Sequence, residues 1–396
     1  MMVSVLLPLV TASEPRHDPE TGKIRLLFTG ELHANVNLFA DWYRLEPRID
    51  IDIVPCSTQD MPLRDARRQV RMYMPRTYDQ LVSQFDCILL GDLNPEVLAP
   101  GFTTDLKKAV VDEGLGAILV EFVYWFGNGN RIDLWMISPF YDIVPADITF
   151  GQEIPRGMDN YYQLIAESDV LDLPGIETYP MNIGHHGAMQ ARPGSKVLAR
   201  WRGTNYDCVT FSTPGNGAII QIGHGWDNIP AETTSGWRYL QDYAYNLVFA
   251  TTRHEIPKDL ELVRKARSLI TRSDEVRSMV FSVLEFAEMF GAKTRSLAAE
   301  VALIDEKRKA AENKYIQGDY EGCAAAYDEI ISEYEQAEEK ALRLKDRALL
   351  WVYLIEWLAV SGTSLLSGSI LYSLMVKKRM YRQVALTRAA SKRRSM

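Results

Sequence analysis

Three residues of the types used in acid–base catalysis each follow an apolar run of the sequence. They are His33, Asp92 and Glu121, which come after the runs 23–28, 85–90 and 116–120. If these runs are parallel strands of an open α/β sheet, their carboxyl ends meet at one crevice, the usual ligand site of such sheets. There the three side chains would bind a polar ligand such as a sugar or peptide, or act as acid and base. The alternative is that they cap helices and pair with loop backbone groups.

Other polar and aromatic residues lie in the same predicted loops. The candidate ligand-binding set comprises Glu31, His33, Asn35, Asp92, Glu121, Phe126 and Trp226. Aromatic rings such as these stack on sugar faces, but rings in loops also pack against one another, and the sequence favours packing.

A second group of histidines offers metal ligands. His185, His186 and His224 lie before and after the late apolar runs, and with His33 or Asp227 they would supply the imidazole and carboxylate groups that zinc accepts. Adjacent histidines in a Gly-rich loop are more typical of turns, so these three are weak candidates and we predict no cofactor. The four cysteines show no CxxC spacing; Cys87 and Cys208 are predicted to pack as small hydrophobes, and a pairing of Cys56 stays open.

The elements that would position these residues alternate between strand and helix from Lys23 to about Thr252. Strands are predicted at 23–28, 50–54, 85–90 and 116–120, with helices at 36–45 and 105–112. Later strands at 197–201, 207–212 and 217–223 are closer together and separated by Gly, Pro and Asn, and a helix at 237–250 closes the domain. The predicted fold class is α/β, a flavodoxin-like doubly wound sheet with an antiparallel extension.

Several motifs of this domain resemble the class I glutamine-amidotransferase-like family, which is related to ThuA-type domains. The residues that carry the likeness are LLGD (89–92), GLGAILVE (114–121), YWFGNG (124–129) and NGAIIQIGHGW (216–226), followed by Trp237 and Asn246. The likeness covers roughly 23–252 and implies the fold. The C-terminal part also resembles mostly archaeal membrane proteins that join such a domain to a helical stalk and a transmembrane anchor.

The sequence departs from that family at its essential residues. A true class I amidotransferase has a cysteine nucleophile at the elbow after its central strand, activated by the histidine of a His-x-Glu motif. Here Glu121-Phe122 occupy the elbow, and His-x-Glu does not occur in the sequence. The resemblance therefore implies a degenerate domain that does not hydrolyse glutamine.

From Pro257 the pattern is helical throughout. Two helices are predicted at 257–272 and 274–290, with Ser273 or Asp274 as the cap between them. Helices at 294–316 and from 319 onward carry small and apolar residues at steps of three and four, which is typical of a coiled-coil seam. Arg308 interrupts that seam. We predict a helical-hairpin stalk over 257–348 with its tip at 317–319; half of a tetratricopeptide repeat is the alternative for 311–330.

Residues 349–376 form an apolar stretch of 28 residues whose only charge is Glu356. As a helix it would rise about 42 Å, against about 30 Å for the hydrocarbon core of a bilayer. The tail 377–396 holds eight basic residues and no acid, which by the positive-inside bias predicts a cytoplasmic tail and an outward-facing domain. Ser364 and Gly368 form a small face suited to helix contact, whereas Glu356 would face a partner or lie near the interface.

The charge of the chain and its first residues carry two further predictions. The net charge is −8, or −16 without the basic tail, which argues against nucleic acid or anionic lipid as the main ligand of the domain. Residues 1–22 are predicted to be a signal-peptide remnant, ending near Val10-Thr11-Ala12, or a disordered tail or edge strand.

We expect a single-pass protein of the cell membrane whose domain at 23–252 is a non-catalytic binding or scaffold module of a cell-envelope complex. It would meet a protein partner or a second copy through its stalk and membrane helix, and a carbohydrate ligand is compatible with its loops. The alternative is a hydrolase that acts on envelope carbohydrate or peptide through His33, Asp92 and Glu121.

Overall fold

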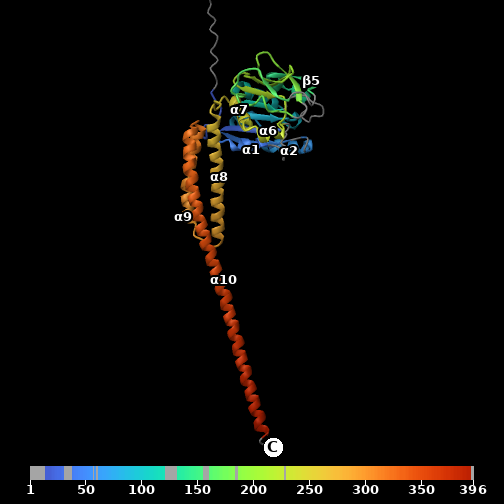
Figure 1. The fold of residues 1–396 in the computed structure, drawn as a ribbon. Coiled ribbons are helices and arrows are strands. Elements are labelled where there is room, and N and C mark those ends of the chain that lie inside the picture. Colours follow the sequence, from blue (N-terminus) through green and yellow to red (C-terminus); the bar gives the residue numbers. More distant parts are fainter. Residues whose placement is uncertain are drawn as a thin grey trace, which may run out of the picture. The chain divides into compact units, whose positions relative to one another are not determined.

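A computed structural model describes residues 14–30, 38–56, 58, 61–120, 132–154, 160–182, 186–226 and 229–393 (Figure 1). The chain divides into two compact units. The first is Met1–Arg267 with Glu312–Glu321, and the second is Ser268–Ala311 with Gly322–Met396.

The first unit is built on a ten-stranded mixed sheet whose parallel part has the order β2-β1-β3-β4-β10. These strands are β1 (Ile24–Gly30), β2 (Ile49–Pro55), β3 (Cys87–Gly91), β4 (Gly116–Val120) and β10 (Ala218–Ile222). The central strands β3, β4 and β10 are almost wholly apolar and buried, as strands covered on both faces must be. This order is the flavodoxin-like one, so the predicted fold class is confirmed.

The antiparallel extension continues the sheet beyond β10. Its strands are β5 (Ala146–Ile154), β6 (Tyr162–Leu164), β7 (His186–Ala191), β8 (Lys196–Trp201) and β9 (Asp207–Ser212). β10 pairs with β4 in parallel and with β9 antiparallel. The run at 217–223, which its spacing grouped with the antiparallel strands, is therefore the fifth parallel strand, and the extension begins at β9.

Helices cover both faces of the parallel strands. On one face, α1 (Leu38–Leu45) and α7 (Leu240–Thr251) pack around Phe28 and Tyr43. The opposite face carries a second apolar cluster, to which several helical elements contribute. They are α2 (Leu63–Tyr73), α3 (Tyr78–Gln84), α4 (Phe102–Glu113), α5 (Ile132–Met136) and the 3-10 turn η2 (Pro139–Ile143). The 3-10 turn η1 (Pro95–Val97) also contributes, through the buried Val97, and α6 (Ala231–Gly236) is a separate short helix.

The strands β1, β3 and β4 end at one level, because Gly30 pairs with Gly91 and Gly91 with Val120. The backbones of β1 and β3 approach each other closely at Gly30 and Gly91. A Cβ on Gly30, whose φ is +131°, would lie 1.9 Å from the carbonyl oxygen of Gly91. Only glycine fits there. The three strand ends that the candidate acid–base residues follow therefore share one level of the sheet's carboxyl edge.

The second unit is a bundle formed by parts of three helices, α8 (Leu260–Met289), α9 (Arg295–Ile316) and α10 (Tyr320–Arg393). Arg277 of α8 and Tyr334 of α10 both bond to the Asp305 carboxylate of α9. The predicted hairpin of α9 and α10 is confirmed, and its seam residues Val301, Tyr327 and Ala341 are buried.

The predicted break in the first stalk helix is wrong, since α8 is continuous through Ser273 and Asp274. Neither residue acts as a cap. Ser273 is buried within the bundle, and the Asp274 carboxylate pairs with Arg308 of α9. That ion pair also explains how a charge is tolerated beside the α9 seam.

Beyond Ala348 the character of α10 changes. Ala348 is buried, whereas Leu350 is 67% exposed, and the apolar side chains from there to residue 382 are largely exposed on all sides of the helix. Within the described residues, α10 is the one helix long and apolar enough to cross a membrane, judged by length and composition.

Candidate functional site

Asp92 is the described member of the predicted acid–base set. It follows β3, its side chain is buried with 6% of the residue exposed, and its backbone N–H donates to the Val120 carbonyl across 3.0 Å. Its φ of +43° is in the left-handed region, which non-glycine residues rarely adopt and which is frequent at functional sites. The other two members, His33 and Glu121, lie outside the described residues, as do Glu31, Asn35 and Phe126 of the candidate ligand-binding set. Their grouping with Asp92 stays a prediction.

His224 lies just after β10 and is fully enclosed by the fold. Its Nδ1 is 2.9 Å from the Gly225 carbonyl, and its Nε2 is 2.6 Å from the Tyr162 hydroxyl. Because a carbonyl only accepts, Nδ1 carries the proton and Nε2 accepts from Tyr162. The Tyr243 hydroxyl is 3.1 Å from that of Tyr162 and extends the chain. Burial lowers the pKa of His224 to about 4, so the ring is neutral near pH 7 and both its nitrogens are already bonded.

The remaining metal candidates are described only in part. His185 and Asp227 lie outside the described residues, and of His186 only the backbone, in β7, is described. In the ranges that the structure describes, no group of three or more His, Cys, Asp or Glu side chains is placed to hold a metal ion. All four cysteines are buried and none of them forms a disulfide, including Cys56.

Trp226 is part of an aromatic cluster under the same edge. Its ring stacks on Phe39 of α1 with centroids 4.0 Å apart and planes 11° from parallel, and Phe28 meets it edge-on. Only 9% of the residue is exposed. Phe39 thus covers one face of the Trp226 indole, so that face is not available to a ligand.

A feature that the sequence reasoning missed is a stripe of arginines on α2. Arg64, Arg67, Arg68 and Arg71 stand at steps of i, i+3, i+4 and i+7, all exposed, while Ala66 and Val70 on the opposite side are buried. Such spacing places the four on one face over about 10 Å. None of them forms an ion pair with a described carboxylate. The spacing itself was the signal that could have found this stripe.

The arginine stripe borders a pocket of about 540 Å³. Its lining includes Arg67, Arg71, the segment 95–101, Thr103 and Ser138. The helix α4 begins at this wall with Gly101 as its N-cap, which offers no side-chain acceptor. The positive end of the α4 dipole and two guanidinium groups therefore border the same space. Since α2 and α4 follow β2 and β3, the pocket lies on the carboxyl side of the sheet.

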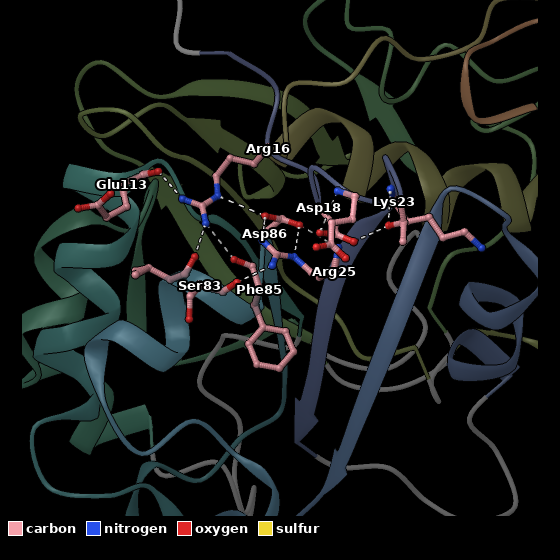
Figure 2. Close-up of polar contacts among 11 residues, drawn as sticks. Arg16, Asp18, Lys23, Arg25, Ser83, Phe85, Asp86 and Glu113 are labelled. Atoms are coloured by element: carbon pink, nitrogen blue, oxygen red, sulfur yellow. Dashed lines mark hydrogen bonds and ion pairs between the residues drawn. The ribbon is translucent and has the colours of Figure 1, made fainter. Parts of the chain in front are cut away.

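The opposite, amino edge of the sheet holds a charged cluster around the buried Asp86 (Figure 2). Arg25 binds both oxygens of this carboxylate, with Nε 2.9 Å from Oδ2 and Nη2 2.8 Å from Oδ1. Arg16 lies 3.6 Å from Oδ1 and donates to backbone carbonyls at the ends of α3 and α4. These contacts tie the segment before β1 to two helix C-termini, which is a structural role.

Neither a protein-family model nor a curated protein matches the sequence. Among solved structures, the chain is similar to the cytoplasmic protein STM3548 from Salmonella typhimurium, with 14% identity, a TM-score of 0.46, and coverage of 58% of this chain and 99% of that one. For the cytoplasmic protein STM1381 from Salmonella typhimurium LT2 the identity is 15% and the TM-score 0.45, with the same coverage.

A weaker likeness links the chain to part of a larger enzyme. It is the exo-beta-1,4-mannosidase Op5Man5 from Opitutaceae bacterium strain TAV5, with 12% identity and a TM-score of 0.32, of which 36% is covered. At these identities and scores, the similarities assign neither a family nor an activity to this chain.

Proposed function

We propose that the protein is anchored in a cell membrane by a single helix, residues 349–376, and holds its α/β domain outside the cytoplasm as a non-catalytic binding or scaffold module. The observation that supports this best is the apolar surface of α10, which is exposed around its whole circumference. In water, each square ångström of exposed apolar surface costs about 25 cal/mol, and a bilayer removes this cost. The backbone polar groups of the helix are hydrogen-bonded within the helix itself, as a membrane span requires.

Assembly within the membrane is the second part of the proposal. Glu356 lies about two turns into the stretch, where it meets the outer interface or a partner. Ser364 and Gly368 are one turn apart and let another helix approach closely. We assign this face to contact with a second copy or with another membrane protein of an envelope complex.

Crosslinking of the full chain in native membranes tests the assembly. The variants are E356L and S364L/G368L, with L366A as control because Leu366 lies on the far side of the helix from the small face. We expect a crosslinked species that persists in L366A and is lost in the other variants. A chain that stays monomeric in every case contradicts assembly through this face while leaving the anchor intact.

The ligand of the module is proposed to be anionic, on the evidence of the arginine stripe. Like charges at i,i+4 cost an isolated helix about 0.2–0.5 kcal/mol per pair, and a bound anion relieves that repulsion. Guanidinium groups form paired hydrogen bonds with carboxylate, sulfate and phosphate groups. The pocket volume of about 540 Å³ falls within the range of small-molecule sites. An acidic envelope glycan fits these features and the expected carbohydrate ligand.

Titration of the detergent-solubilised chain with a sulfated oligosaccharide tests this ligand class. R67Q/R71Q should weaken binding by tenfold or more, about 1.4 kcal/mol. K108Q/K258Q, which removes the same charge at two exposed lysines off the stripe, should leave binding nearly unchanged. Equal losses in both variants would mean that only net charge is sensed, and the pocket would not be the site.

The alternative function, a hydrolase acting through His33, Asp92 and Glu121, has its own test. D92N suits it, because asparagine tolerates the left-handed backbone that Asp92 adopts. Release of sugar or peptide from envelope material by the wild-type chain, and its loss in stably folded D92N, would favour the hydrolase over the non-catalytic module.

A further inference from the structure

The three helices of the second unit are held in a defined register. Arg277 of α8 bonds to Asp305 of α9 with Nε and Oδ1 2.7 Å apart, and Tyr334 of α10 bonds to the same carboxylate. Two further ion pairs, Arg308–Asp274 and Lys340–Glu300, follow the same antiparallel register. These contacts define which residues of α8, α9 and α10 lie at one height along the bundle.

Twelve residues further along α8 and α10, about 18 Å away, the register reaches Met289 and Asp346, and the same step back from Asp305 reaches Lys293, just before α9 begins. The turn between α8 and α9, residues 290–294, therefore lies level with the last residues of α10 before its apolar stretch. Burial agrees, because Ala348 is the last buried residue of α10 up to residue 382. In Figure 1 the turn lies where α10 leaves its two neighbours and continues alone.

The end of α8 at this turn is apolar and exposed. Met289 is 71% exposed, and Phe286 and Phe290 lie with ring centroids 4.8 Å apart and more than a third of their surface open. Lys293 and Arg295, also exposed, follow directly in the turn and the first residue of α9. Aromatic and apolar side chains next to basic ones are the composition found where proteins meet lipid headgroups.

The turn is also well fixed. The Ala292 N–H donates to the Ala287 carbonyl across 3.0 Å, Gly291 has a φ of +80°, and the Thr294 hydroxyl bonds to the Glu288 carboxylate. The Glu288 carboxylate thus has a hydrogen-bond partner within the turn, whereas Glu285 on the same helix is exposed. A fixed turn presents Phe286, Met289 and Phe290 without an ordering cost on contact.

We propose that this turn is a second membrane contact, in which Phe286, Met289 and Phe290 enter the outer headgroup layer beside α10 and Lys293 and Arg295 pair with lipid phosphates. The inference rests on the proposed membrane anchor. A helix of about 42 Å exceeds the hydrocarbon core by about 12 Å, so residues 349–356 occupy the interfacial layer and the turn lies at its outer boundary. A bilayer fits the surface because the apolar side chains and the start of the apolar stretch share one height.

Site-directed spin labelling of the full chain in lipid vesicles tests the proposal. Single cysteines replace Met289 in the turn, Met279 in the bundle and Leu366 in the anchor; the four native cysteines are buried. Met279 is the matched control, since it is 57% exposed on the same helix but about 15 Å farther from the turn. For each label, collision with dissolved oxygen, which concentrates in lipid, is compared with collision with a water-soluble nickel complex.

The expected ratio of oxygen to nickel collisions is highest at M289C and L366C and several-fold lower at M279C. Replacing Lys293 and Arg295 by glutamine should shift the M289C ratio toward that of M279C. If M289C matches M279C while L366C reports lipid, the anchor holds and the turn contact is overturned. If L366C itself reports water, the anchor fails and the turn contact fails with it.

Discussion

Burial decides the charge of His224. An imidazole closed off from water, with Nδ1 donating to Gly225 and Nε2 accepting from Tyr162, has little to gain from a second proton. The sequence offered this residue as a metal ligand, and nothing in its type or spacing distinguishes a buried histidine from a ligating one. The difference lies in Tyr162 and Trp201, which surround it and come from β6 and β8.

The pH dependence of stability follows from that lowered pKa. The unfolded chain takes up a proton at His224 below its ordinary value of 6.5, whereas the folded chain does not until about pH 4. Stability from this residue is therefore complete above about pH 6.5 and is lost as the pH falls toward 4, by roughly 3 kcal/mol. Denaturant titrations of the solubilised chain at pH 7.5 and 4.5 should show a smaller loss in H224Q. An unchanged loss in H224Q would contradict the assignment.

Among the elements, the tip of the α9–α10 hairpin stands out because residues 312–321 belong to the first unit. Tyr315 near the end of α9 donates to Glu46 Oε2 across 3.1 Å. Arg267 reaches the same oxygen at 3.0 Å and Asp242 Oδ1 at 3.1 Å. All four side chains are buried, so each charge depends on the others for solvation.

Breaking this network should destabilise the first unit strongly. R267M leaves Glu46 and Asp242 buried without their cation and should cost about 3–5 kcal/mol of unfolding free energy. Y315F removes the hydrogen bond that the hydroxyl donates to Glu46 and the longer one that it accepts from Arg267, and should cost about 1–2 kcal/mol. R44M, which breaks an exposed pair with Asp41, is the matched control and should cost less than about 1 kcal/mol. The comparison is made by chemical denaturation; similar values for R267M and R44M would show that the network contributes little.

Elements with strong periodicity were predictable, and those without it were not. The apolar runs of β1, β3 and β4 and the three-four spacing of α9 and α10 dictated burial, and the structure agrees. The short β6 and the polar β5 gave no comparable signal, and β10 was misplaced because pairing partners cannot be inferred from spacing. At the site, the shared level of the strand ends was foreseen. The arginine stripe was not predicted, because the net charge of −8 is a sum over the whole chain and does not report a local basic pattern such as that of α2.

At the scale of the whole molecule, orientation is the property that the charge distribution predicts. The basic tail after residue 376 favours the cytoplasm, which would place the domain before the membrane helix outside. A membrane-impermeant maleimide applied to intact cells should therefore label K108C, on the exposed side of α4, and leave S391C in the tail unlabelled until the cells are lysed. The buried native cysteines keep the background low. Labelling of S391C in intact cells would reverse the proposed topology.

The contact between Gly30 and Gly91 also bears on evolution. Because any side chain at position 30 would collide with the Gly91 carbonyl, no other amino acid can replace this glycine without disturbing the sheet. In chains descended from a common ancestor, the residue aligned with Gly30 should stay glycine as the loops after β1 and β3 diverge. Lineages could thus exchange one ligand specificity for another, and the glycine would mark their kinship after the loops no longer do.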